Sequence, residues 1–87
     1  MAKLDFKEEF WTDNSGKKSI NTLTVVVDGN PASTWRKPDL TILAAKNDTD
    51  IKGTLKYSLM GIINMLAPKE QEDITAKVIA KIRSYNL

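Results

Sequence analysis

The chain contains neither cysteine nor histidine among its 87 residues. Without a thiol or an imidazole it cannot form a Ser-His-Asp or Cys-His catalytic set, and it lacks the usual ligands of a zinc site. Small secreted domains commonly depend on disulfide bonds, so the absence of cysteine favours a cytoplasmic location. We therefore expect a protein that is not an enzyme and that binds no cofactor and no metal.

Glycine is also scarce, and its four residues are scattered along the chain. The sequence therefore has no phosphate-binding glycine loop and no dinucleotide-binding fingerprint. The segment from Asp48 to Gly53 has the spacing of a calcium loop, but Lys52 and Leu59 stand where such a loop needs oxygen ligands. We interpret its acidic residues, together with Asn47, as the cap of a helix.

The carboxylates do not form an acid–base pair. Glu8 and Glu9 are neighbours in an extended segment, where successive side chains point to opposite faces. Glu70, Glu72 and Asp73 fall in the first turns of a predicted helix, where acidic residues stabilise the helix dipole. We expect structural roles for both groups.

Long hydrophobic runs are missing as well. The most apolar stretch, residues 59–67, is much shorter than the roughly 20 residues of a transmembrane helix, so we expect no membrane partner. The 13 basic and 11 acidic residues leave a net charge of +2, a weaker basic bias than that of most duplex-DNA-binding proteins. The chain length predicts one domain spanning residues 1–87.

The first half of the sequence predicts an antiparallel sheet of three to four strands that begins with a β-hairpin. In residues 3–11, Leu4, Phe6, Glu8 and Phe10 alternate with Trp11 and other residues of the opposite face. Because three of these four are apolar, we expect their face to point inward. A turn over residues 13–17 leads to a Thr- and Val-rich strand over residues 20–27.

The next segment is ambiguous. After the turn signal of residues 28–31, residues 32–36 predict a third strand. Residues 40–45 fit either a buried strand or a short helix opened by Pro38 and Asp39. We favour the strand, because Thr41 and Ile42 are β-branched.

The second half predicts two helices, one running from the cap at residues 47–50 to about Ala67 and one from about Lys69 to Asn86. Each carries an apolar stripe at helical spacing. Segregated strands and helices indicate an α+β domain in which the two helices cover one face of the sheet.

Two groups of residues are candidates for binding. The first combines aromatic and basic residues and is the candidate partner-binding set: Trp11, Lys17, Lys18, Trp35, Arg36 and Lys37. Such residues suit a protein interface or single-stranded nucleic acid, and they also suit a core edge and solvated loops. The second lies on the back of the first predicted helix and is the candidate self-association set: Tyr57, Met60, Gly61 and Asn64. Its alternative is a central helix wrapped on several sides.

These features predict a small non-enzymatic interaction protein that binds a protein partner, as an inhibitor, regulator or assembly factor. Domains of this composition are common among accessory proteins of phages and mobile elements. The alternative is a protein that binds single-stranded nucleic acid through an aromatic and basic sheet surface. A weaker alternative is the capture of a small anionic ligand at the start of the last helix or in an oligomer interface. Self-association into a homo-oligomer is a further expectation.

Overall fold

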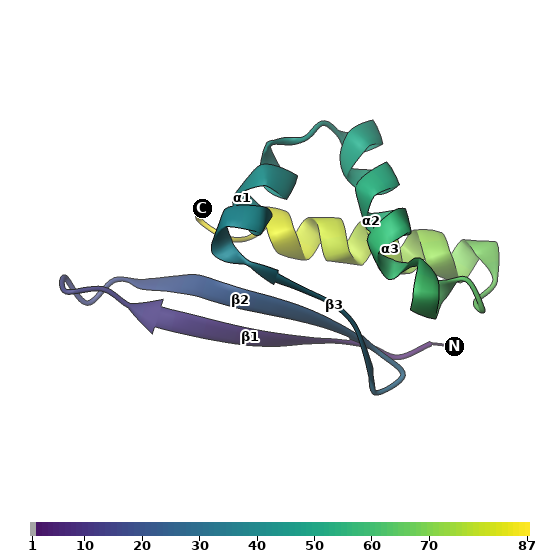
Figure 1. Ribbon diagram of the computed structural model, residues 1–87, viewed down its shortest axis with the longest axis horizontal. Coiled ribbons are helices and arrows are strands. Elements are labelled where there is room, and N and C mark those ends of the chain that lie inside the picture. Colours follow the sequence, from purple (N-terminus) through teal and green to yellow (C-terminus); the bar gives the residue numbers. More distant parts are fainter. Residues whose placement is uncertain (1) are drawn as a thin grey trace.

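The computed structural model describes residues 2–87 and consists of an antiparallel sheet followed by helices (Figure 1). The strands are β1 (Leu4–Thr12), β2 (Lys18–Val27) and β3 (Asn30–Arg36), and their order in the sheet is β1-β2-β3. The predicted α+β class, with strands first, is confirmed. Within the described residues the sheet has three strands, the lower end of the predicted range, and β1 and β3 form its two edges.

Turn chemistry and one bulge set the register of the first hairpin. The Asp13 carboxylate accepts hydrogen bonds from the backbone N–H groups of Ser15 and Lys17, and Gly16 takes the positive φ of 85° that closes the loop. Phe6 pairs with Val25, but the register shifts after Glu9, so that Phe10 pairs with Ile20. The extra residue on β2 keeps the apolar side chains on both sides of the bulge on the same face.

The prediction of a strand over residues 40–45 is wrong, because these residues belong to helix α1 (Lys37–Ala45). Pro38 lies in the first turn, where its missing N–H has no helical partner to lose and its fixed φ favours the helix. Leu40 and Leu43 are buried, whereas Ile42 is 60% exposed. The burial therefore follows a helical spacing of three residues instead of the two-residue alternation of a strand.

The two predicted helices are present with shorter C-terminal ends. Helix α2 (Asp48–Ile63) begins after Asn47, whose side chain accepts a hydrogen bond from the backbone N–H of Asp50. Helix α3 (Pro68–Arg83) begins with a proline in its first turn. The capping role predicted for residues 47–50 is confirmed, and α2 and α3 end four and three residues before the predicted positions.

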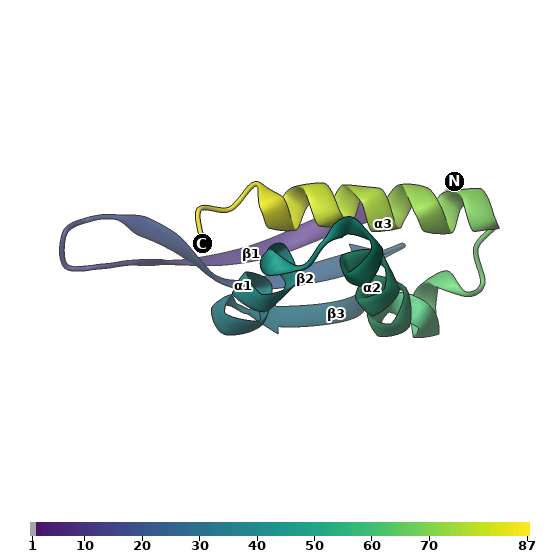
Figure 2. The same cartoon turned by 90° about the horizontal axis from the view of Figure 1, so that it is seen from above.

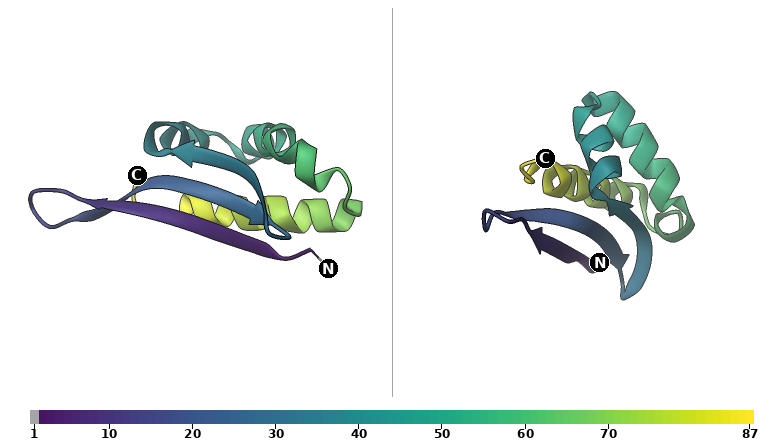
Figure 3. Two further views of the ribbon diagram at one scale, coloured as in Figure 1. Left: turned by 60° about the horizontal axis from the view of Figure 1, so that its bottom comes forward. Right: turned by 60° about the vertical axis from the view of Figure 1, so that its left-hand side comes forward.

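The three helices cover one face of the sheet and leave the other open (Figure 3). Helices α1 and α2 pack over β3, and both contact α3, which runs above β1 (Figure 2). The inner face of β2 provides Leu23, Val25 and Val27 to a core shared with all three helices. The predicted apolar stripes of α2 and α3 are buried in this core, at Leu55, Leu59, Ile63, Ile74, Val78, Ile79 and Ile82.

Candidate functional site

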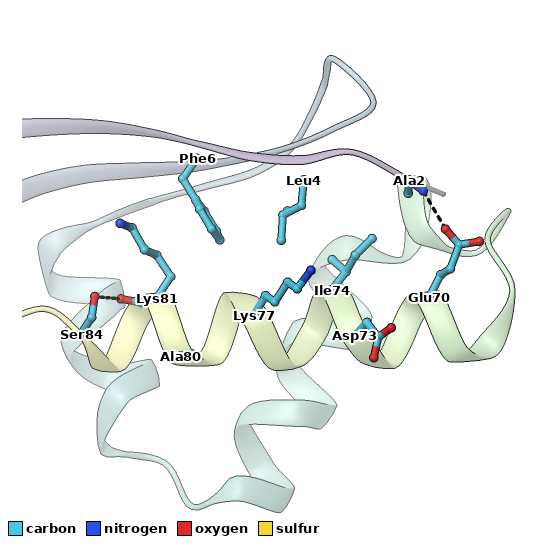
Figure 4. Close-up of a pocket in the computed structure, with 10 residues that line it drawn as sticks. All are labelled: Ala2, Leu4, Phe6, Glu70, Asp73, Ile74, Lys77, Ala80, Lys81 and Ser84. Atoms are coloured by element: carbon cyan, nitrogen blue, oxygen red, sulfur yellow. Dashed lines mark hydrogen bonds between the residues drawn. The ribbon is translucent and has the colours of Figure 1, made fainter.

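A groove of about 550 Å³ lies between the inner face of β1 and helix α3 (Figure 4). We call it the β1–α3 groove. Its lining residues are Ala2, Leu4, Phe6, Glu70, Asp73, Ile74, Lys77, Ala80, Lys81 and Ser84. Those on α3 recur every three to four positions, so one face of the helix looks onto the strand. Leu4 and Phe6 point from β1 toward α3, and the Lys77 and Lys81 side chains extend from α3 toward the strand (Figure 4).

The groove exists because α3 does not close completely onto β1. Leu4 and Phe6 are only half-buried, although their cross-strand partners Val27 and Val25 are almost entirely buried. The inner face of the sheet is therefore sealed at β2 and remains partly open at β1. An edge strand with a half-covered apolar face can accept a further side chain beneath the helix.

Both ends of the groove are tied by polar contacts between the N-terminal segment that contains β1 and the C-terminal segment that contains α3. At one end, the backbone N–H of Ala2 donates to Oε2 of Glu70 over 2.7 Å. At the other end, the Tyr85 hydroxyl donates to Oε2 of Glu8 over 2.6 Å, and Nζ of Lys81 lies 3.2 Å from Oε1 of the same carboxylate. The groove thus lies between the contact of Ala2 with Glu70 and the contacts of Glu8 with Tyr85 and Lys81.

At the polar end of the groove, the Glu8 carboxylate is paired with a cation and a hydroxyl donor. The Tyr85 hydroxyl and the Lys81 ammonium hold the pKa of Glu8 below its usual range, against the opposing effect of burial. Burial and the Glu8 carboxylate raise the pKa of the Tyr85 hydroxyl well above its usual value. Lys81 also lies 5.6 Å from the centre of the Phe6 ring and 5.7 Å from that of Tyr85. The ion pair between Glu8 and Lys81, together with the Tyr85 hydroxyl, is therefore already satisfied within the chain.

The edge of β1 beside the groove carries unpaired backbone groups. The N–H of Asp28 donates to the carbonyl of Lys3 over 2.8 Å, and the N–H of Asp13 donates to the carbonyl of Lys17 over 3.0 Å. The backbone N–H and C=O groups of the odd-numbered residues of β1 thus point toward β2 in the antiparallel ladder. The alternation points the N–H and C=O groups of Leu4, Phe6 and Glu8 away from β2, at the free edge of the sheet.

The structure separates the members of the candidate partner-binding set. Trp35 is 8% exposed and belongs to the core, on the face that the helices cover. Trp11 is 66% exposed and pairs with Ser19 on the open face. The other members of the set are exposed, namely Lys17, Lys18, Arg36 and Lys37. The two tryptophans therefore lie on opposite faces, and Trp35 has the core role that the alternative interpretation gave it.

The candidate self-association set lies on the outer face of α2. All its members are exposed, with Tyr57 at 77%, so α2 is not wrapped on several sides. A Cβ atom built at Gly61 would meet nothing within 4 Å, so the packing of this chain does not require glycine there. Whether a second copy contacts this face stays a prediction.

Sequence reasoning missed the β1–α3 groove and the Glu8 network. One signal was present, because Glu8 interrupts an otherwise apolar inward face of β1. Lys81 and Tyr85 are four residues apart, a spacing that places both side chains on one side of the α3 segment. Since Tyr85 lies 77 residues from Glu8, no local pattern connects the two halves of the network.

The described part of the chain contains no cluster of three acidic, histidine or cysteine side chains suited to a metal ion. Among residues 2–87, no helix is both long enough and apolar enough to cross a membrane. Comparison with known proteins adds no further constraint, since no family model, no curated protein and no solved structure matches this chain. The case for function therefore depends on the groove and its surroundings.

Proposed function

We propose that this protein is a non-enzymatic protein-binding domain that holds an extended segment of a partner polypeptide in the β1–α3 groove. Such a domain would act as an inhibitor, regulator or assembly factor. The observation that carries the proposal is the position of the groove directly beside an unpaired edge strand. The same residues, Leu4 and Phe6, line the groove with their side chains and present free backbone groups at the edge.

This combination supports binding by strand addition. In that mode a partner segment joins an exposed sheet edge, main-chain hydrogen bonds provide affinity, and pockets for alternate side chains provide specificity. The groove volume of about 550 Å³ is within the range of ligand-binding pockets in proteins. Leu4, Phe6 and Ile74 offer apolar contact to the side chains that would point beneath α3.

The polar groups of the groove favour binding over catalysis. Glu8 is engaged by Tyr85 and Lys81, and Glu70 accepts the hydrogen bond from Ala2. A general acid or base has to approach the reacting atom and exchange a proton near neutral pH. The lowered pKa of Glu8 makes this carboxylate a weaker proton acceptor. These groups support a scaffold that shapes the groove.

The proposal is tested by selecting binders from a displayed library of random linear peptides. We expect enriched peptides to bind the wild-type protein and to shift the NMR signals of Leu4, Phe6 and Ile74. Replacing Ala80 with tryptophan fills the groove with a large side chain and should abolish binding. The matched control is Ala45→Trp, which changes an exposed alanine of α1 that does not line the groove.

Two outcomes contradict the proposal. One is the absence of any enriched peptide from a diverse library. The other is equal binding by wild-type protein and Ala80→Trp, because a peptide that ignores a blocked groove binds elsewhere. Retention of the fold in both tryptophan variants is checked by circular dichroism, so that a lost signal reflects the groove.

A second candidate function is the binding of single-stranded nucleic acid at the hairpin end of the sheet. The observation that favours it is the exposure of Trp11 on the open face, together with the exposed basic residues Lys17, Arg36 and Lys37; Lys18 is also exposed but lies over the Phe10 ring on the opposite face. An aromatic platform beside cations is the usual means of holding single strands without reading their sequence. Titration of oligonucleotides at low salt should then quench Trp11 fluorescence, and an unchanged signal would remove this candidate.

A further inference from the structure

The outer face of β1 carries charges of alternating sign. Its exposed residues Lys3, Asp5, Lys7 and Glu9 occupy successive positions of that face. On β2, Val26 lies opposite Asp5 and threonines lie opposite Lys7 and Glu9, whereas Lys3 lies opposite the acidic Asp28. Lys3 and Asp5 approach each other to 3.9 Å, and among residues 2–87 Lys7 and Glu9 form no ion pair. The charges of Lys7 and Glu9 are therefore available to a strand on the free side of β1, and those of Lys3 and Asp5 form an exposed pair beside them.

We infer that the segment held in the β1–α3 groove is an antiparallel strand whose outer side chains alternate between acidic and basic and whose inner side chains are apolar. The inference rests on the proposed function and specifies the sequence of the partner segment. The inferred partner strand carries basic residues opposite Glu9 and Asp5. It carries acidic residues opposite Lys7 and Lys3. Opposite Phe6 and Leu4 it places large apolar residues.

The backbone fixes which partner residues face the groove. In an antiparallel pair, residues that exchange both hydrogen bonds lie directly opposite each other, with side chains on the same face of the sheet. The free groups of β1 belong to its even-numbered residues, whose side chains point inward. The partner residues that bond to Leu4 and Phe6 therefore also project beneath α3, toward Ile74 and Lys77 (Figure 4).

A peptide segment fits this edge better than a second copy of the domain does. Helix α3 crosses above the N-terminal part of β1 (Figure 2). Antiparallel pairing of β1 with its own copy would bring two α3 helices over strands that are about 5 Å apart. Packed helices keep their axes about 8–10 Å apart, so the two copies would collide. A single strand brings no helix layer with it and avoids the collision.

Charge on an edge strand also discourages indiscriminate pairing. The alternation along β1 would therefore reject segments of uniform charge and admit the complementary pattern. Opposite charges in directly facing positions of a sheet stabilise it, and like charges destabilise it, by about 0.2–1 kcal/mol per pair. The outer face thus contributes selectivity, while the apolar groove and the main chain contribute most of the affinity.

The first experiment measures strand addition with a capped synthetic peptide of sequence Lys-Thr-Glu-Leu-Lys-Leu-Glu. Its two leucines lie opposite Phe6 and Leu4 in the inferred register. N-methylation of both leucines removes two donors to β1 and should weaken binding by at least about tenfold. N-methylation of the central glutamate and lysine alters groups that point away from β1 and should leave the affinity within about twofold.

The second experiment reverses one charge on the protein. Lys7→Glu faces the central glutamate of the peptide and should weaken binding by about three- to tenfold. A peptide with lysine in place of that glutamate should restore the affinity to Lys7→Glu and bind wild-type protein less well. Lys56→Glu makes the same change at an exposed position of α2, away from the groove, and is the matched control with no expected effect.

Several results would overturn the inference and are separable from failure of the proposed function. Tolerance of both N-methylated peptides excludes strand addition, and loss of binding only at the charged positions indicates a parallel strand. An unchanged affinity in Lys7→Glu excludes charge selection. No binding of the designed peptide at about 1 mM, alongside groove binding by library-selected peptides, rejects this sequence class and leaves the proposed function standing.

Discussion

At the scale of single residues, Glu8 is the position where local pattern and tertiary structure differ most. A carboxylate on the inward face of a strand is costly unless it is paired. Here it receives a hydrogen bond from Tyr85 and forms an ion pair with Lys81, and both partners lie more than 70 residues from Glu8 in the sequence. The alternation of β1 predicts the direction of the Glu8 side chain. It cannot predict its partners, because they depend on how α3 crosses the sheet.

The bond between Tyr85 and Glu8 should be measurable as a stability difference. Replacing Tyr85 with phenylalanine removes the donor and keeps the ring, and we expect unfolding at pH 7 to become easier by about 1 kcal/mol. The matched control is Tyr57→Phe, since Tyr57 is 77% exposed and its replacement should change stability by less than about 0.5 kcal/mol. Urea unfolding curves measure both, and equal effects of the two substitutions would contradict the assigned role.

The stability difference between wild type and Tyr85→Phe should depend on pH in a defined direction. The pKa of Glu8 in the folded protein lies below its ordinary value of 4.5, so the ionised carboxylate favours the folded state. This contribution is complete above the ordinary value and is lost as the pH falls through the lowered one. The stability gap between wild type and Tyr85→Phe should therefore shrink when unfolding is measured at pH 3 instead of pH 7. A gap that widens in acid would show that Glu8 does not titrate as the structure implies.

At the scale of elements, the strength of each periodic pattern determined what could be predicted. The long apolar stripes of α2 and α3 and the alternation of β1 identify these elements correctly, with their ends displaced by a few residues. Residues 40–45 are too short for either period to dominate. β-branched side chains at Thr41 and Ile42 favoured a strand, but Pro38 and the burial available over β3 decided for a helix.

The helical conformation of α1 predicts unequal effects of substitutions at Leu40 and Ile42, whereas a strand would predict similar effects. In a strand, Leu40 and Ile42 would share one face, whereas in α1 Leu40 is fully buried and Ile42 is 60% exposed. Leu40→Ala should therefore destabilise the protein by about 2–5 kcal/mol through the cavity it leaves. Ile42→Ala should change stability by less than about 0.5 kcal/mol. Thermal or urea unfolding measures both, and similar losses for the two would speak against the helix.

At the scale of the whole molecule, the sheet has one covered face and one open face, and this division decides which candidate residues can meet. Trp35 pairs with the core residue Leu23, and Trp11 pairs with Ser19 beyond the bulge at Asn21. Which face each tryptophan occupies depends on register, since a shift of one residue reverses it. Composition and spacing alone therefore could not show that Trp11 and Trp35 lie on opposite faces of the sheet. The β1–α3 groove was equally out of reach, because it is made by two elements from opposite ends of the chain.

The division between the faces can be measured with single-tryptophan variants. Trp11→Phe leaves only Trp35, whose emission should be blue-shifted and weakly quenched by iodide, because its indole is 8% exposed. Trp35→Phe leaves only Trp11, which at 66% exposure should emit at longer wavelength and be quenched several-fold more strongly. Equal quenching in the two folded variants would mean that the helices do not cover the face containing Trp35. The nucleic-acid candidate depends on the same contrast, since an oligonucleotide on the open face can perturb Trp11 while Trp35 remains shielded behind the sheet.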